Sequence, residues 1–152
     1  FPSELAPVAR KINENMPIIS AEKILGLIDS DGGNKKALIL GYSYKPNLGD
    51  IRMTPVLTLA QKLNQNGVGI TIWDPHVNPA KIPSWIRISK DPYAESEYDI
   101  VILATAHDEC LKLDWGKLLQ CTPSGLIFDG RRALSVSEME KNGWEYHGVG
   151  IP

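Results

Sequence analysis

The stretch "ALILGYSYKPNLGDIRMTP" (residues 37–55) joins an apolar run, a charged turn and the start of a helix. The apolar run at 37–44 is typical of a strand that is covered on both faces of a parallel sheet. Thr54 followed by Pro55 has the pattern of a helix N-cap and the first helical residue. This stretch therefore indicates an α/β fold.

The alternation of strands and helices continues along the chain. "NQNG" (64–67) closes the helix that starts at Pro55. We expect further strands at 68–75, 85–89, 98–106, 125–130 and 145–150, and a short helix at 114–120. Buried strands separated by helices imply parallel pairing through right-handed crossovers. The prediction for residues 37–152 is a Rossmann-like parallel sheet flanked by helices.

The N-terminal part has a different pattern. Residues 1–28 carry apolar side chains at helical spacing, which predicts an N-terminal helical segment. Pro17 has no amide hydrogen, so it either kinks this helix or opens a second one. Residues 29–36, "DSDGGNKK", are polar and contain glycine, which predicts a linker. A single amphipathic helix must pack on the following domain or on a partner.

Composition excludes several classes of protein. The 152 residues suit one domain, and the net charge of -2 without a basic stripe argues against nucleic-acid binding. No apolar stretch reaches the ~20 residues of a membrane span. Cys110 and Cys121 match no zinc spacing, and His76, His107 and His147 are too scattered for metal ligands, so we expect no metal site. Two reduced thiols predict a cytoplasmic protein.

The charged turn has the features of an anion site. Lys45 follows the predicted strand at 37–44, and Arg52 lies just before the helix start. A helix N-terminus directs free amides and partial positive charge to the same place, which favours phosphate. Asp50 would repel an anion, so we expect it to orient Arg52 through a salt bridge. The alternative is an ordinary charged surface loop.

A second basic group follows the predicted strand at 125–130. In "DGRR" (129–132), Arg131 is expected on the same rim of the sheet as Lys45. The planar fork of arginine suits phosphate or carboxylate, and Asp129 could hold it. The alternative is a pair of solvated arginines.

Two other polar residues lie at the ends of predicted strands. Asp74 in "WDPH" (73–76) stands where dinucleotide folds place an acid for a ribose hydroxyl, although an Asp-Pro turn that ends a strand is commoner. A lone histidine such as His107 is more often a structural hydrogen-bonding group, although its location suits a ligand contact. The chain contains no nucleophile elbow, Walker loop or metalloprotease motif. These residues indicate a binding unit with no catalytic residue.

Taken together, the motifs resemble a known family. "GYSYKPNLGDIRMTP" (41–55) is similar to the G-x-x-[FY]-K-x-x-x-x-D-x-R-x-[ST]-P signature of the nucleotide-sugar 6-dehydrogenases. That family comprises the UDP-glucose, GDP-mannose and UDP-N-acetylhexosamine dehydrogenases. "WDPHV", "YDIVILATAHDE", "DW" and "IFDGRR" recur in this order in its C-terminal domain, and "ARKINENMP" resembles the end of its central helix. The resemblance covers essentially the whole chain.

The resemblance implies an activity for a longer protein. The complete enzymes oxidise the C6 alcohol of a nucleotide sugar to a carboxylate, in two NAD-dependent steps through a thioester. The catalytic cysteine motif and the glycine-rich NAD turn have no counterpart here, so we expect an inactive C-terminal fragment whose NAD is bound mainly by a missing N-terminal domain. Residues 1–28 would end the central helix region, which commonly builds a homodimer.

The resemblance also assigns roles to residues. Tyr44 and Lys45 would contact the sugar nucleotide, Arg131 would reach its phosphate or sugar side, Arg52 would face NAD, and Asp50 would orient the turn. "YKPN" and "NENMP" favour the UDP-N-acetylmannosamine or -galactosamine branch, whose uronic acids enter polysaccharide biosynthesis. The alternative function is a stand-alone α/β domain that binds or senses a phosphorylated ligand without redox chemistry.

Overall fold

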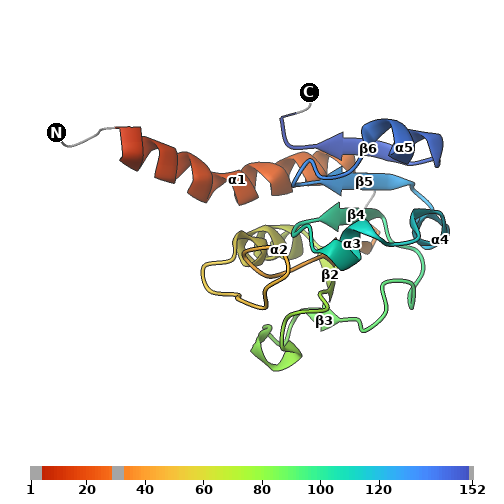
Figure 1. Cartoon of the computed structure of the whole chain (residues 1–152), viewed down its shortest axis with the longest axis horizontal. Helices are drawn as coiled ribbons and strands as arrows, with labels where there is room; N and C mark the ends of the chain where they lie inside the picture. Colours follow the sequence, from red (N-terminus) through yellow and green to blue (C-terminus); the bar gives the residue numbers. More distant parts are fainter. Residues whose placement is uncertain (1–4, 29–32, 151–152) are drawn as a thin grey trace.

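The sheet has six parallel strands in the order β3-β2-β1-β4-β5-β6 (Figure 1). The computed structural model describes residues 5–28 and 33–150. This strand order is that of a doubly wound Rossmann sheet, in which the direction of winding reverses between β1 and β4. The predicted Rossmann-like fold is therefore confirmed.

Each expected strand is present but shorter than its apolar run. The strands are β1 (Lys35–Leu40), β2 (Val68–Trp73), β3 (Arg87–Ile88), β4 (Ile100–Leu103), β5 (Leu126–Asp129) and β6 (Glu145–Gly148). The helices are α1 (Leu5–Leu27), α2 (Pro55–Gln65), a 3-10 turn η1 (Pro79–Lys81), α3 (Asp108–Leu111), α4 (Trp115–Gln120) and α5 (Val136–Lys141). The sequence did not predict η1, α3 or α5.

Helices cover both faces of the sheet. On one face, α1 and α2 pack on side chains such as Ile39 and Ile72. On the other face, α3, α4 and α5 pack on residues such as Leu40 and Leu103. Successive side chains of a strand point to opposite faces, so the continuous apolar runs supply both cores.

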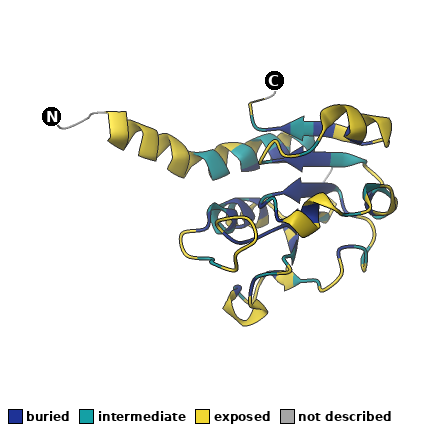
Figure 2. Cartoon of the chain, viewed as in Figure 1, coloured by how far each residue is buried: buried dark blue, intermediate teal, exposed yellow. Residues whose placement is uncertain are grey.

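Helix α1 is a single helix that continues through Pro17, so no second helix begins there. Its C-terminal half buries Ala21 and Ile24 completely, whereas residues 5–15 are exposed and extend beyond the body of the domain (Figures 1 and 2). Strand β1 begins at Lys35, inside the predicted linker at 29–36, of which residues 29–32 lie outside the described ranges. No helix in the described ranges is long and apolar enough to cross a membrane.

Strand β1 ends at Leu40, four residues earlier than predicted. Gly41 follows with a φ of 88°, a conformation that favours glycine. A Cβ atom on Gly41 would collide with Thr105, which comes after β4. The close approach of these two segments turns the chain out of the sheet, so Tyr44 and Lys45 belong to a loop.

Candidate functional site

Residues 44–53, here called the 44–53 loop, connect the region after β1 to α2. The Tyr44 amide donates to the Asp50 carbonyl at 2.8 Å, which closes the loop on itself. Gly49 lies so close to the His76 carbonyl that a Cβ atom would collide with it. The loop is therefore compact and rests on the turn that follows β2.

The start of α2 has the expected cap. Thr54 has an extended backbone, and its hydroxyl accepts from the Val56 amide at 3.2 Å and donates to the Tyr42 carbonyl at 2.7 Å. Pro55 occupies the first helical turn, where its missing amide hydrogen costs no hydrogen bond. The cap thus attaches the helix start to the segment that leaves β1.

Asp50 and Arg52 form the salt bridge expected from the sequence. Arg52 Nη2 lies 2.8 Å from Asp50 Oδ2, and Arg52 Nε lies 3.0 Å from Asp50 Oδ1. Hydrogen bonds from the Arg52 side chain, and then from its amide, lower the pKa of Asp50 to about 2. The Arg52 side chain is 87% exposed, so the pair lies on the outer surface of the 44–53 loop.

A cavity of about 1100 Å³ lies between α1 and the carboxyl edge of the sheet. It is lined by Tyr44, by Thr54 at the start of α2, by Arg131 after β5, and by Arg10 and Asn13 of α1, among others. This cavity lies where parallel α/β sheets bind ligands, outside the carboxyl ends of the strands.

Arg131 and Tyr44 meet at this cavity. Arg131 Nη2 donates to the Tyr44 carbonyl at 3.4 Å, although 87 residues separate them in the sequence. Tyr44 is 47% exposed. Lys45 is exposed on the 44–53 loop and does not line the cavity in this structure. Arg131 thus lies beside the 44–53 loop at the edge of the sheet where it was expected, and it lines the cavity, whereas Lys45 does not.

Asp129 holds the turn that carries Arg131. Its Oδ1 accepts from the Arg131 amide at 3.0 Å, and its Oδ2 accepts from the Leu134 amide at 2.9 Å and the Tyr146 hydroxyl at 2.8 Å. Burial, and then this hydrogen bond to Asp129, raise the pKa of Tyr146 to about 12. Asp129 therefore fixes the backbone of Arg131 and leaves its guanidinium directed toward Tyr44.

Asp74 and His107 form a buried pair that the sequence did not predict. Asp74 directly follows β2, His107 lies in the segment between β4 and α3, and their Oδ2 and Nε2 atoms are 2.9 Å apart. Both side chains are at most 1% exposed. Asp74 therefore serves the turn after β2 and the loop after β1, not a ribose hydroxyl. The only signal available in the sequence was that both residues lie at the ends of predicted buried strands.

No metal site is found among residues 5–28 and 33–150. No three His, Cys, Asp or Glu side chains are grouped to hold a metal ion there. Burial, and then the charge of Asp74, raise the pKa of Cys110 to about 12, so this thiol stays protonated. The site can bind an anion through Arg131 and the start of α2, and neither cysteine lines the cavity.

Comparisons with known proteins support this description. Curated relatives include the UDP-glucose 6-dehydrogenases of Rhizobium meliloti (28% identity over 99% of this chain and 35% of the relative) and of Bacillus subtilis, TuaD (28% over 100% and 34%). The chain thus spans about a third of the length of the curated relatives it matches.

Solved structures share the fold. The NDP-N-acetyl-D-galactosaminuronic acid dehydrogenase from Methanosarcina mazei superposes with a TM-score of 0.84 at 21% identity, over 99% of this chain and 33% of that one. The UDP-N-acetyl-mannosamine dehydrogenase Cap5O from Staphylococcus aureus gives 0.76 at 24% identity, over 97% and 34%.

Residues 38–136 match the family described as "UDP-glucose/GDP-mannose dehydrogenase family, UDP binding domain". The match begins within β1 and ends in α5, so it includes the 44–53 loop, the start of α2 and Arg131. The chain therefore belongs to the UDP-glucose/GDP-mannose dehydrogenase family, whose UDP-binding domain it contains.

Proposed function

We propose that this chain binds the UDP-sugar substrate of an NAD-dependent 6-dehydrogenase, which oxidises the C6 alcohol of the sugar to a uronate. The observation that carries the proposal is the cavity in a UDP-binding domain where Arg131 and the start of α2 meet. A guanidinium and a helix N-terminus are both suited to a diphosphate. Tyr44 and Lys45 would contact the rest of the nucleotide sugar from the 44–53 loop.

The outer surface of the 44–53 loop is suited to meet the remaining domains of a longer enzyme. Leu48 is 54% exposed, and Met53, which also lines the cavity, is 86% exposed and has a φ of 55°. Large apolar side chains on a surface commonly mark a contact with another protein part. Arg52 lies beside them, already oriented by Asp50, and would face NAD bound on the N-terminal domain.

The sugar and the assembly follow from the same proposal. "YKPN" (44–47) and "NENMP" (13–17) favour a UDP-N-acetylated hexose, whose uronate serves polysaccharide biosynthesis in the cytoplasm. The exposed apolar residues of α1 would form a homodimer interface. The redox chemistry would require the further two-thirds of length that the curated relatives have.

Titration of the 152-residue chain with UDP tests the binding role. We expect a Kd on the order of 1 mM, because one charged group and one helix end bind a diphosphate only weakly. Arg131→Ala should raise the Kd at least about tenfold, since a charge-assisted hydrogen bond contributes roughly 1.5–3 kcal/mol. Lys45→Ala should raise it by about threefold, as expected for an exposed charge.

The control variant is Lys141→Ala, which removes one positive charge at the far end of α5. It should leave the Kd for UDP unchanged. None of the three variants should shift the melting temperature by more than a typical surface substitution does. Equal affinity of the Arg131→Ala and wild-type chains for UDP would disprove the assigned site. NADH formation from a UDP-sugar by this chain alone would disprove its proposed role as a binding part only.

A further inference from the structure

His107, which comes after β4, holds the 44–53 loop near its midpoint, at Asn47. The Asn47 amide donates to His107 Nδ1 at 2.7 Å, and the Asn47 side-chain oxygen accepts from the Asp108 amide at 2.9 Å. Asn47 has a φ of 63°, in the left-handed region that glycine favours and that asparagine tolerates better than most other residues. These two hydrogen bonds hold it.

The same hydrogen bond fixes the tautomer of His107. Because Nδ1 accepts a hydrogen bond from the Asn47 amide, it carries no hydrogen of its own, and the ring hydrogen must be on Nε2. Nε2 lies 2.9 Å from Asp74 Oδ2 and 3.2 Å from Ser43 Oγ, whose own hydroxyl donates to the Lys45 carbonyl at 2.9 Å. The ring therefore accepts on one side and donates on the other.

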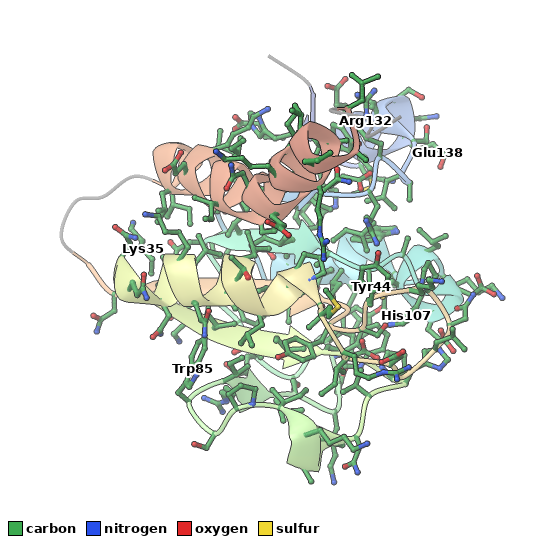
Figure 3. All side chains as sticks on the ribbon, turned by 90° about the vertical axis from the view of Figure 1, so that its left-hand side faces the viewer. Lys35, Tyr44, Trp85, His107, Arg132 and Glu138 are labelled. Carbon is green, nitrogen blue, oxygen red and sulfur yellow. The ribbon has the colours of Figure 1, made fainter. Side chains whose placement is uncertain are left out.

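Asp74 extends this connection to the base of the loop. Its Oδ2 also accepts from the amides of Tyr42 at 2.7 Å and Ser43 at 3.1 Å. The buried His107 ring thus links the segment that enters the 44–53 loop to the midpoint of that loop. Tyr44 and His107 lie at the same end of the sheet (Figure 3).

We propose that His107 is a positioning residue for the UDP site, which acts through Asn47 to hold the 44–53 loop in its binding conformation. The proposal rests on the proposed function and adds a residue outside the cavity lining to it. A loop that loses the contact with His107 spends less time in the competent conformation. The apparent Kd for UDP rises in proportion to that loss.

Two substitutions test the two ring nitrogens of His107 separately. His107→Asn keeps an acceptor near the position of Nδ1, for the Asn47 amide, and loses the donor to Asp74. His107→Gln keeps a donor near the position of Nε2, for Asp74, and loses the acceptor for Asn47. A positioning role predicts that His107→Gln raises the Kd for UDP by about fivefold or more, as a drop of the competent population to about a fifth would. His107→Asn should stay within about twofold of wild type.

Stability should respond in the opposite order. Asp74 is buried, so the loss of its histidine donor in His107→Asn should lower the melting temperature more than His107→Gln does. A merely structural role of His107 would change the melting temperatures and leave both Kd values alike. That result, or a larger Kd increase in His107→Asn than in His107→Gln, would overturn the proposal.

Measurements on the wild-type chain do not depend on the folding of a variant. Long-range ¹H–¹⁵N NMR should show His107 protonated on Nε2 only, and saturating UDP should slow hydrogen exchange of the Asn47 amide. Protonation on Nδ1, or an Asn47 exchange rate that UDP does not change, would count against His107. Failure of the wild-type chain to bind UDP would instead disprove the proposed function. In that case the tautomer of His107, and the hydrogen exchange of the Asn47 amide in the two His107 variants, would still show whether His107 holds the loop.

Discussion

Asp74 accepts more hydrogen bonds than an aspartate that only ends a strand or binds a ribose hydroxyl would need. Its two oxygens accept from His107 and from the amides of Tyr42, Ser43, His76 and Val77, at 2.7–3.2 Å. Burial by itself raises the pKa of Asp74, but the hydrogen bonds from His107 and from the amides outweigh that effect and lower the pKa to about 2. The charged form is therefore the one that stabilises the fold.

This shift predicts a pH dependence of stability. A folded-state pKa near 2, below the unfolded value near 3.9, gives stabilisation that is complete above about pH 5 and is lost as the pH falls through 2. The free energy of unfolding of the wild-type chain should exceed that of Asp74→Asn at pH 6, and the difference should shrink by about 2 kcal/mol between pH 5 and pH 2. Urea denaturation at several pH values measures it.

A difference in the free energy of unfolding that does not change with pH would contradict this prediction. A difference between wild type and Asp74→Asn that stays constant from pH 5 to pH 2 would mean that protonation of Asp74 costs nothing. In that case the amides around Asp74 would be satisfied as well by a neutral side chain as by the carboxylate.

At the scale of elements, Pro17 is the residue that conflicts most with its surroundings. It lies inside α1, where it removes one backbone hydrogen bond and crowds the carbonyl of the preceding turn, at a cost of ~3 kcal/mol. Pro17→Ala should therefore increase the helicity of residues 5–16, seen as stronger ellipticity at 222 nm and slower amide exchange. The melting temperature of the sheet should barely change, because the exposed half of α1 has little packing to transmit the gain.

Pro55→Ala is the matched control. Pro55 opens α2, where a proline costs no helical hydrogen bond, so its replacement should bring no gain in helicity. Lower helicity in Pro17→Ala would contradict the prediction and would show that the Pro17 ring, which lines the cavity, stabilises α1 by packing.

The elements that the sequence predicted well are those with long apolar patterns. Strand β1 and helix α2 have such patterns. Helix α2 begins and ends where the sequence predicted. The ends of β1 were wrong, and its C-terminal end was placed too late because apolar side chains such as Tyr42 continue past the last sheet hydrogen bond. Helix α5 was missed because it buries a single residue, Met139, so that six residues show no periodicity.

The candidate site was predictable only in part, for a related reason. Arg131 follows a strand, and Thr54 and Pro55 mark the start of α2, so the placement of both at one edge of the sheet could be inferred from parallel strands. The contact between Asn47 and His107 depends on the path of an irregular loop, which no periodicity records. Its only trace in the sequence is Gly49, required because the loop passes close to the His76 carbonyl.

At the scale of the whole molecule, the two halves of α1 have different surroundings. The C-terminal half packs on the domain, whereas the N-terminal half exposes Leu5 (80%), Val8 (56%) and Ile12 (55%), followed by Ile19 (52%) on the same side. Steps of three, four and seven residues place these four side chains along one stripe of the helix. An apolar stripe that the domain itself does not cover is suited to a second copy of the chain.

Ile12→Asp tests that assembly. A charge in the middle of the stripe should convert a dimer to a monomer, because an unpaired carboxylate in an apolar interface is costly to desolvate. Sedimentation equilibrium of the wild-type chain should show a concentration-dependent dimer, and the variant should remain monomeric with an unchanged melting temperature of the sheet. Asn13→Asp adds the same charge beside the stripe, on the side that lines the cavity, and should leave the dimer intact. If Ile12→Asp dimerised as strongly as the wild-type chain, the interface would lie elsewhere. If the wild-type chain were monomeric at millimolar concentration, this stripe alone would not hold two copies together.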